Sequence, residues 1–172
     1  LPLWLAACGG GSKDLDRDVT PPVVTPPVPV EVTGPGELKG ATHINTIAVG
    51  DIAAALKSAD SKAPQVAPRY AVDSWRITYL TTDGHGKSVT ASGLVSVPVK
   101  PAGVASPVVS YQHGTIFKDA DAPSNNVVAS EPPLIMASLG AIVLAPDYVG
   151  YGASKGAQHP YLLSAPAAAA VT

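Results

Sequence analysis

Two short apolar runs, separated by the length of one helix, constrain the fold of this chain more than any other feature. The runs are Pro107–Tyr111 and Ala141–Ala145, and neither shows the polar and apolar alternation of a strand with one solvated face. Such runs are typical of strands that are covered on both faces in a parallel sheet. The segment Val127–Leu139 between them has room for the crossover helix that parallel strands need. The sequence therefore predicts one βαβ unit and an α/β fold.

A glycine-containing motif follows each predicted strand directly. Residues 113–115 (HGT) come after the first run, and residues 147–152 (DYVGYG) come after the second. Ligands of open α/β sheets bind outside the carboxyl ends of the strands. We therefore expect both motifs to lie at the binding site, together with the long polar loop 116–133 that follows the first motif.

Composition excludes several classes of protein. With 172 residues, of which 46% are hydrophobic, the chain has enough apolar content for one domain with a core. Its 11 basic and 13 acidic residues form no basic stripe, which argues against nucleic acid as a partner. The four histidines are scattered and the single cysteine stands alone, so no metal site is predicted. No phosphate loop or dinucleotide fingerprint indicates a cofactor.

The N-terminus indicates a lipid anchor. Residues 1–8 (LPLWLAAC) form an apolar run that ends in small residues, as the last part of a secretory signal peptide does. The end of this run resembles the bacterial lipobox, which makes Cys8 a candidate lipidation site and a membrane a candidate partner. The run is too short to span a bilayer, so a lipidated chain would be anchored to the membrane and not inserted through it.

This anchor predicts a place in the bacterial cell envelope. Gly9 stands after the cysteine where an Asp would favour the inner membrane, and this favours the outer membrane. The alternatives are a secreted protein, or an apolar N-terminus with a chance cysteine.

Three regions are expected along the chain. Residues 1–8 are the end of a lipoprotein signal peptide, residues 9–36 are a flexible proline-rich linker, and residues 37–172 are the folded region. Within the folded region, residues 51–57 predict a short helix with Asp51 as its N-cap and with Ile52 and Leu56 on one face.

A β-hairpin is predicted after this helix. Trp75, Ile77 and Tyr79 alternate with polar residues and share one face of the first arm. The segment DGHG at 83–86 supplies a glycine-rich turn, and valines alternate with serine and threonine in the return arm 88–99. Alternation in both arms predicts an antiparallel pair whose apolar face is buried.

The last element predicted is an alanine-rich helix. Ser164 is its expected N-cap, Pro166 lies in its first turn, and we expect the helix to continue to the end of the sequence at Thr172.

This ordered set of elements resembles the first half of an α/β-hydrolase domain. The segments YQHGT at 111–115, APDYVGYGASKG at 145–156 and HPYL at 159–162 are similar to those of bacterial esterases and secreted lipases of that superfamily. The resemblance covers roughly residues 70–172. It implies an α/β-hydrolase fold that begins with an antiparallel hairpin, continues with parallel βαβ strands, and is truncated before the nucleophile elbow.

The resemblance assigns the HGT motif to an oxyanion hole. Acyl transfer places negative charge on the former carbonyl oxygen, and preorganised backbone N–H groups stabilise this charge. In α/β-hydrolases one such donor comes from the loop after the third strand. By resemblance Thr115 is the candidate donor, Gly114 allows the sharp turn, and His113 braces the loop instead of acting as a base. An ordinary tight turn after a strand is the alternative.

Ser154 lies in a literal Gly-x-Ser-x-Gly match, which is the nucleophile motif of this superfamily. A nucleophile elbow needs an apolar strand running into the turn and a helix directly after it. Neither is predicted, because aromatic residues and Gly150 precede the match and Pro160 restricts His159 to extended geometry. The segment instead matches the Asp-x-x-Gly-x-Gly-x-Ser loop of the family, in which the serine is structural. Ser154 is therefore judged a decoy.

The second motif supplies candidates for the substrate pocket. Tyrosines of this loop, and Tyr161 beyond it, can line an acyl or leaving-group pocket, although single aromatic residues more often serve in packing. The glycines allow backbone conformations that are closed to other residues, and the carboxylate can accept loop N–H groups. The pocket candidates are Asp147, Tyr148, Gly150, Tyr151 and Gly152.

The resemblance implies a serine ester hydrolase of the carboxylesterase or triacylglycerol lipase type. Such an enzyme acts on a small-molecule or lipid ester through an acyl-enzyme, and its nucleophile, acid and base occur in the chain order Ser, Asp or Glu, His. No convincing nucleophile elbow is present, so we expect the triad to lie beyond Thr172 and the isolated chain to be inactive. The alternatives are a peptidase or other acyl hydrolase on the same fold, and a non-catalytic surface-binding lipoprotein.

Overall fold

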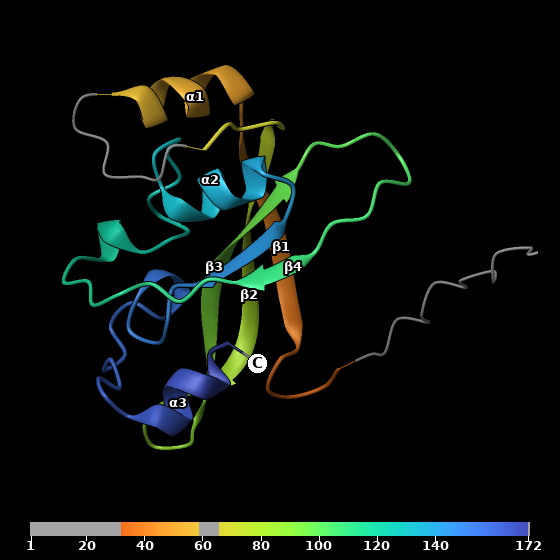
Figure 1. The fold of residues 1–172 in the computed structure, drawn as a ribbon. Coiled ribbons are helices and arrows are strands. Elements are labelled where there is room, and N and C mark those ends of the chain that lie inside the picture. The colour runs from red at the N-terminus through yellow and green to blue at the C-terminus, as the bar shows by residue number, and fades with distance from the viewer. Residues whose placement is uncertain (1–31, 59–65, 172) are drawn as a thin grey trace, which may run out of the picture. The chain divides into compact units, whose positions relative to one another are not determined.

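A long antiparallel hairpin forms the centre of the fold (Figure 1). The computed structural model describes residues 32–58 and 66–171, and in it β2 (Val72–Thr82) pairs with β3 (Ser88–Pro98). Asp83 fixes the turn between them, because its carboxylate accepts the backbone N–H groups of His85 at 2.8 Å and Lys87 at 2.9 Å. The predicted hairpin is confirmed.

A strand that the sequence analysis missed flanks this hairpin. β1 (Leu38–Ile47) pairs with β2 in antiparallel register, with irregularities between Leu38 and Gly40 and between His43 and Asn45. β1 lies at one edge of the sheet and most of its residues are exposed, so the sequence carries no regular apolar alternation there. Cys8, the predicted signal-peptide end and nearly all of the predicted linker lie outside the described residues.

The predicted βαβ unit is present. β4 (Val108–Ser110) and β5 (Ile142–Pro146) are parallel neighbours, and α2 (Pro132–Ser138) lies between them in the chain. β5 also pairs with β3 in antiparallel register, so the sheet order is β1-β2-β3-β5-β4. The unit therefore extends the hairpin into one mixed five-stranded sheet.

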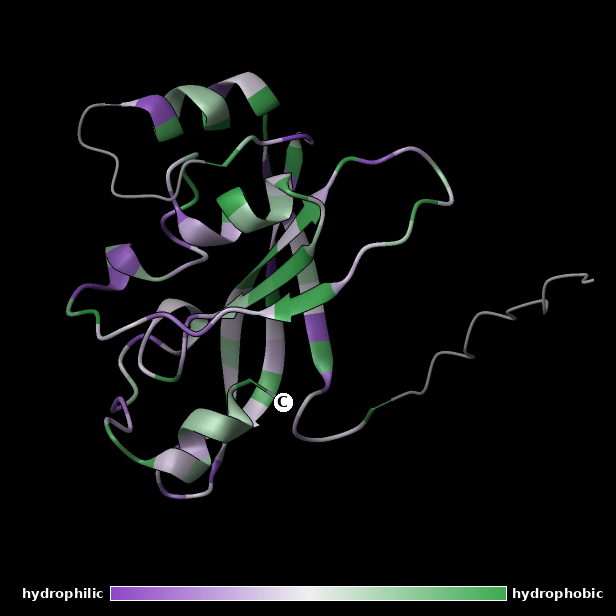
Figure 2. Ribbon diagram, in the orientation of Figure 1, coloured by the Kyte–Doolittle hydropathy of each residue, from purple (hydrophilic) through white to green (hydrophobic). Residues whose placement is uncertain are grey.

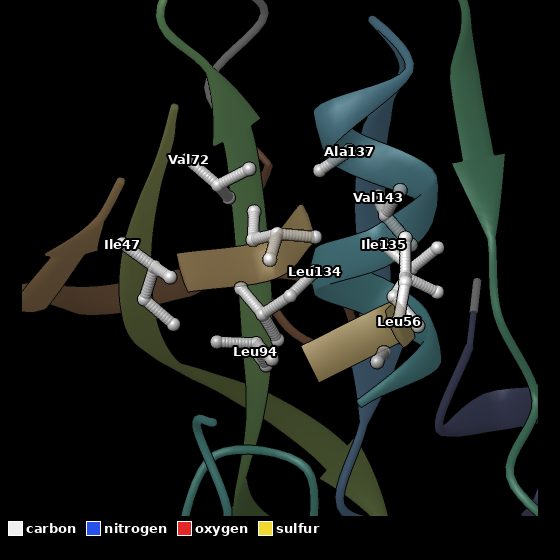
Figure 3. Close-up of a cluster of buried hydrophobic side chains, with 10 residues drawn as sticks. Ile47, Leu56, Val72, Leu94, Leu134, Ile135, Ala137 and Val143 are labelled. Atoms are coloured by element: carbon white, nitrogen blue, oxygen red, sulfur yellow. The ribbon is translucent and has the colours of Figure 1, made fainter. Parts of the chain in front are cut away.

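The core lies between one face of this sheet and the helices α1 (Val49–Lys57) and α2 (Figure 3). Leu134 of α2 and Ile52 of α1 are completely buried, as is Val143 of β5. Truncating such a side chain costs about 2–5 kcal/mol because it leaves a cavity. The core residues are Ile47, Ile52, Leu56, Val72, Leu94, Leu134, Ile135, Ala137, Val143 and Ala145.

The predicted burial of both faces of the βαβ strands is wrong. Val108 of β4 is 66% exposed and Leu144 of β5 is 36% exposed, since α1 and α2 cover the opposite face of the sheet. Hydrophobic residues nevertheless run along β4 and β5 (Figure 2).

The buried face of the hairpin also differs from the prediction. Ser74 and Ser96 are directly opposite each other and completely buried, whereas Trp75 on the apolar face is 37% exposed. The helices pack on the serine-bearing side, where small side chains leave room for large residues such as Leu134.

Both predicted helix caps are wrong, although both helices form. α1 begins at Val49 after Ala48, two residues before Asp51, and Ile52 and Leu56 are buried as expected. α3 (Ser164–Ala169) begins after Leu163, so the predicted cap Ser164 is its first residue.

α3 ends at Ala169 and does not continue to the end of the sequence. Two hydroxyl groups of β2 satisfy the carbonyl groups at this end, because Thr81 donates to Ala169 at 2.7 Å and Tyr79 donates to Ala170 at 2.6 Å. Burial, together with the nearby charge of Asp147, raises the pKa of Tyr79, so its phenol remains a proton donor. None of the helices in the described residues has the length and hydropathy needed to cross a membrane.

Candidate functional site

The two motif loops meet at one edge of the sheet. β4 and β5 are parallel, so the residues that follow their carboxyl ends lie side by side, and the backbone N–H of Tyr111 still donates to Leu144 at 2.8 Å. A cavity of about 310 Å³ lies at this edge. Its walls come from residues within 113–116, 148–151 and 159–167, and none of the lining side chains is an acid, a lysine or an arginine.

The first wall is the HGT loop. Gly114 and Thr115 are exposed and line the cavity, and their backbone N–H groups donate to no other described residue. Gly114 lies outside the left-handed region of φ, and a Cβ built on it would meet nothing within 4 Å. The turn therefore does not require glycine for backbone conformation or for space, contrary to the expectation. The loop does present free donors to the cavity.

His113 braces this loop from within. Its Nδ1 lies 2.7 Å from the carbonyl oxygen of Gly114, and its ring packs edge-on against Tyr148 with 4.8 Å between the ring centroids. Its Nε2 is buried and has no hydrogen-bond partner among the described residues. This placement agrees with a supporting role, and neither ring nitrogen forms a hydrogen bond with a serine or threonine of the described residues.

The second wall is the DYVGYG loop, of which Tyr148 and Tyr151 line the cavity. Asp147 lies beneath the wall and is completely buried. Its carboxylate accepts the hydroxyl groups of Ser92 at 2.5 Å and Ser124 at 2.6 Å, and the backbone N–H of Ser124 at 2.8 Å. A buried carboxylate with three donors is satisfied where it stands, so Asp147 anchors the loop and does not face the cavity.

The two glycines of this loop are required by close packing. Gly150 has φ +100°, and a Cβ on it would lie 2.9 Å from Cβ of His159. Gly152 has φ +56°, and a Cβ there would collide with the side chains of Ser92 and Asp147. Both glycines therefore shape the wall from behind instead of contacting the cavity.

Ser154 is held inside the loop. It lies in the short helix η2 (Gly152–Ser154), and its side chain is buried. Its hydroxyl accepts the backbone N–H of Gly150 at 3.0 Å and donates to the carbonyl of Tyr151 at 2.9 Å. No described serine forms a hydrogen bond with a histidine.

The third wall was largely missed by the sequence analysis, which singled out only Tyr161. His159 enters it with Nδ1 2.7 Å from the carbonyl oxygen of Val149, and its ring lies 5.2 Å from that of Tyr151. Leu162 is 86% exposed and has φ +60°, which is rare for a leucine. The available sequence signal was the HPYL segment directly before α3.

The long loop 116–133 contributes little to the cavity. Only Ile116 lines it, although the whole loop was expected to do so. Ser124 instead receives two hydrogen bonds from Arg76, from Nε to the hydroxyl oxygen at 3.0 Å and from Nη2 to the carbonyl oxygen at 2.8 Å. The loop therefore supports Asp147 from below, because its polar side chains and its backbone are used in these contacts.

Comparisons with known proteins place this architecture among hydrolases. A hydrolase-assigned protein from Legionella pneumophila is 31% identical, with a TM-score of 0.61 over 72% of this chain and 33% of that one. The rice cell wall degrading esterase LipA from Xanthomonas oryzae is 28% identical, with a TM-score of 0.63 over 80% of this chain and 35% of that one. The chain thus spans about a third of the length of these structures. No family model and no curated protein matches it.

Proposed function

The chain is related to esterases of the α/β-hydrolase fold and forms part of that fold, and we propose that it supplies the oxyanion loop of a serine ester hydrolase. The observation that carries this proposal is the pair of free backbone N–H groups at Gly114 and Thr115 in the cavity wall. Gly114 and Thr115 are exposed at the cavity, so a substrate oxygen that displaces water there can accept their N–H groups.

The reaction follows from what such donors do. A nucleophilic serine attacks the ester carbonyl, and the carbonyl oxygen becomes an oxyanion that the Thr115 N–H stabilises. The base takes the proton of the serine hydroxyl during this attack and gives it to the leaving alcohol. Water, activated by the same base, then releases the acid from the acyl-enzyme. The described residues contain no serine bound to a histidine, so the nucleophile, acid and base are proposed to come from elsewhere in a longer protein.

The cavity favours a neutral ester. Its lining contains tyrosine, histidine and aliphatic side chains but no acid, lysine or arginine among the described residues. A charged substrate group would lose water there without gaining an ionic partner. We therefore propose a small-molecule or lipid ester without a formal charge near the scissile bond.

Cys8 and its apolar leader support a further proposal about location. Lipidation of Cys8 would hold the catalytic domain at a membrane of the cell envelope through the proline-rich segment. Metabolic labelling with a radioactive fatty acid tests this, with Cys8→Ser as the control. Labelling that survives Cys8→Ser would contradict it.

Replacing the donor N–H tests the oxyanion assignment. Thr115→Pro removes the N–H, and Thr115→Ala keeps it while removing the same hydroxyl. In the longer protein that carries this segment, the proline variant is expected to lower kcat for a neutral ester about 10²–10³-fold, the loss typical of one oxyanion donor. The alanine variant is expected to retain kcat. Equal kcat values in both variants, with both folded, would exclude this N–H from the reaction.

A further inference from the structure

The loop that carries Gly114 and Thr115 is joined to the rest of the fold at its two ends by tyrosine hydroxyl groups. We infer that Tyr148 and Tyr151, together called the clamp, are positioning residues. They hold residues 112–116 in place and so fix the direction of the donor N–H groups. The catalytic consequence of this inference rests on the proposed function, but the claim that the two tyrosines hold the loop does not.

Tyr148 holds the first end. Its hydroxyl group donates to Oε1 of Gln112, and the amide of Gln112 donates in turn to the Ser110 hydroxyl group at 2.7 Å. The ring of Tyr148 also packs on His113, the next residue of the loop. The first end is therefore connected through one side chain to both the carboxyl end of β4 and the DYVGYG loop.

Tyr151 holds the second end. Its hydroxyl group donates to the carbonyl oxygen of Ile116 at 2.7 Å. Within the described residues, this bond and the Tyr148–Gln112 bond are the hydrogen bonds that join residues 112–116 to a segment distant in the sequence. Because the N–H groups of this loop donate to no described residue, no backbone ladder in the described part of the chain takes over this task.

The clamp itself is rigidly mounted. Tyr148 has φ +64°, a conformation that bulky residues adopt only where the surroundings enforce it. The residues on both sides of Tyr148 are held in place, because Asp147 is fixed by three hydrogen bonds and Gly150 packs against His159. Burial raises the pKa of Tyr148, so its phenol keeps the proton that it donates to Gln112.

Single-hydroxyl variants test the clamp in the chain itself. Tyr148→Phe and Tyr151→Phe each remove one hydrogen bond and keep the ring. Tyr161→Phe is the matched control, because Tyr161 lines the same cavity and its hydroxyl group donates to no described residue. The readout is the ¹⁵N relaxation of the backbone amides of residues 113–116, with far-UV circular dichroism to verify that each variant is folded.

The order parameters of these amides are expected to lie near 0.85 in the parent chain and in Tyr161→Phe, and to fall below about 0.6 in the double variant Tyr148→Phe/Tyr151→Phe. Unchanged order in the folded double variant would overturn the inference. In the longer protein, Tyr148→Phe is expected to lower kcat about 10- to 100-fold with little change in KM, since a misplaced catalytic group costs rate. A change confined to KM would overturn the positioning role.

The two proposals fail in different ways. If the double variant loses loop order but the longer protein hydrolyses no ester, the proposed function is wrong and the clamp is supported. Ester hydrolysis that is lost in Thr115→Pro but unaffected in the double variant would support the proposed function and overturn the catalytic consequence of the inference.

Discussion

The backbone N–H of Gly152 donates to Oδ1 of Asp119 at 2.7 Å, and this bond joins the two loops that follow the parallel strands. The second oxygen of the same carboxylate lies 3.2 Å from Nζ of Lys155. One side chain of the short helix η1 (Asp119–Asp121) therefore supports the loop that carries Tyr148 and Tyr151.

This relationship predicts a contribution to the free energy of unfolding that is lost in acid. The Gly152 N–H, and after it Lys155, lower the pKa of Asp119 below the ordinary value of an aspartate. A lowered pKa means that the stabilisation is complete above the unfolded value and is lost as the pH falls through the folded value. Urea unfolding of the parent chain and Asp119→Asn is expected to show a difference at pH 7 that shrinks below about pH 4.

Asp121→Asn is the matched control, because Asp121 is exposed in the same short helix and its side chain forms no hydrogen bond with a described residue. Asp121→Asn is expected to lose less free energy of unfolding at pH 7 than Asp119→Asn. A difference for Asp119→Asn that persists unchanged to pH 2 would show that the charge contributes nothing.

Two opposed serines in the core predict a stabilising substitution. Ser74 and Ser96 are completely buried, and neither hydroxyl group has a hydrogen-bond partner among the described residues. A buried unsatisfied hydroxyl costs about 1–3 kcal/mol, so Ser96→Ala is expected to raise the free energy of unfolding by roughly 1 kcal/mol. Chemical denaturation measures this change.

Ser92→Ala is the comparison, because Ser92 is equally buried but donates to Asp147 and accepts the Ala153 N–H at 2.8 Å. Its loss is expected to lower the free energy of unfolding by about 2–3 kcal/mol, since a buried charge loses a donor. A destabilising Ser96→Ala would indicate a partner for that hydroxyl.

Gly152 predicts a severe steric effect that can be separated from backbone strain. Gly152→Ala would place a methyl group against Ser92 and Asp147. Gly156 has φ +98°, but a methyl group there would meet no atom within 4 Å. A residue with a Cβ in the left-handed region costs about 1–2 kcal/mol. Gly156→Ala is expected to lose about that much in free energy of unfolding, and Gly152→Ala is expected to lose more or fail to fold. Equal losses would mean that the loop relaxes around the new methyl group.

Covalent labelling tests the place of Ser154. Because its hydroxyl is buried and bonded to backbone groups, a fluorophosphonate is expected to label neither the 172-residue chain nor Ser154→Ala. An intact serine hydrolase serves as the positive control for the reagent. Labelling of the parent chain that disappears in Ser154→Ala would make Ser154 the nucleophile and contradict the decoy assignment.

The open face of the sheet predicts self-association of the isolated chain. Val108 is 66% exposed on β4, and β4 is the last strand in the sheet of the described residues. An apolar edge strand is a template for pairing with another chain, and a lysine there discourages it. Val108→Lys is expected to lower the apparent mass in sedimentation velocity experiments. A parent chain that is monomeric and unfolds cooperatively would contradict this prediction.

The sequence determined the βαβ unit, the hairpin and the meeting of two motifs at one sheet edge. These features rest on local patterns, because apolar runs, alternation and turn glycines act over a few residues. The same patterns gave the partial α/β-hydrolase fold by resemblance, and the comparisons confirm it. The positions of Tyr148 and Tyr151 beside the HGT loop follow from the parallel pairing of β4 and β5.

Only the tertiary structure decided which face of the hairpin is buried, and the sequence pattern favoured the wrong one. The choice depends on which side α1 and α2 cover, and this follows from contacts between segments far apart in the chain. The same holds for Asp147, whose donors Ser92 and Ser124 lie 55 and 23 residues away. Local sequence cannot specify such partners, because the energy that selects them arises only when the segments pack together.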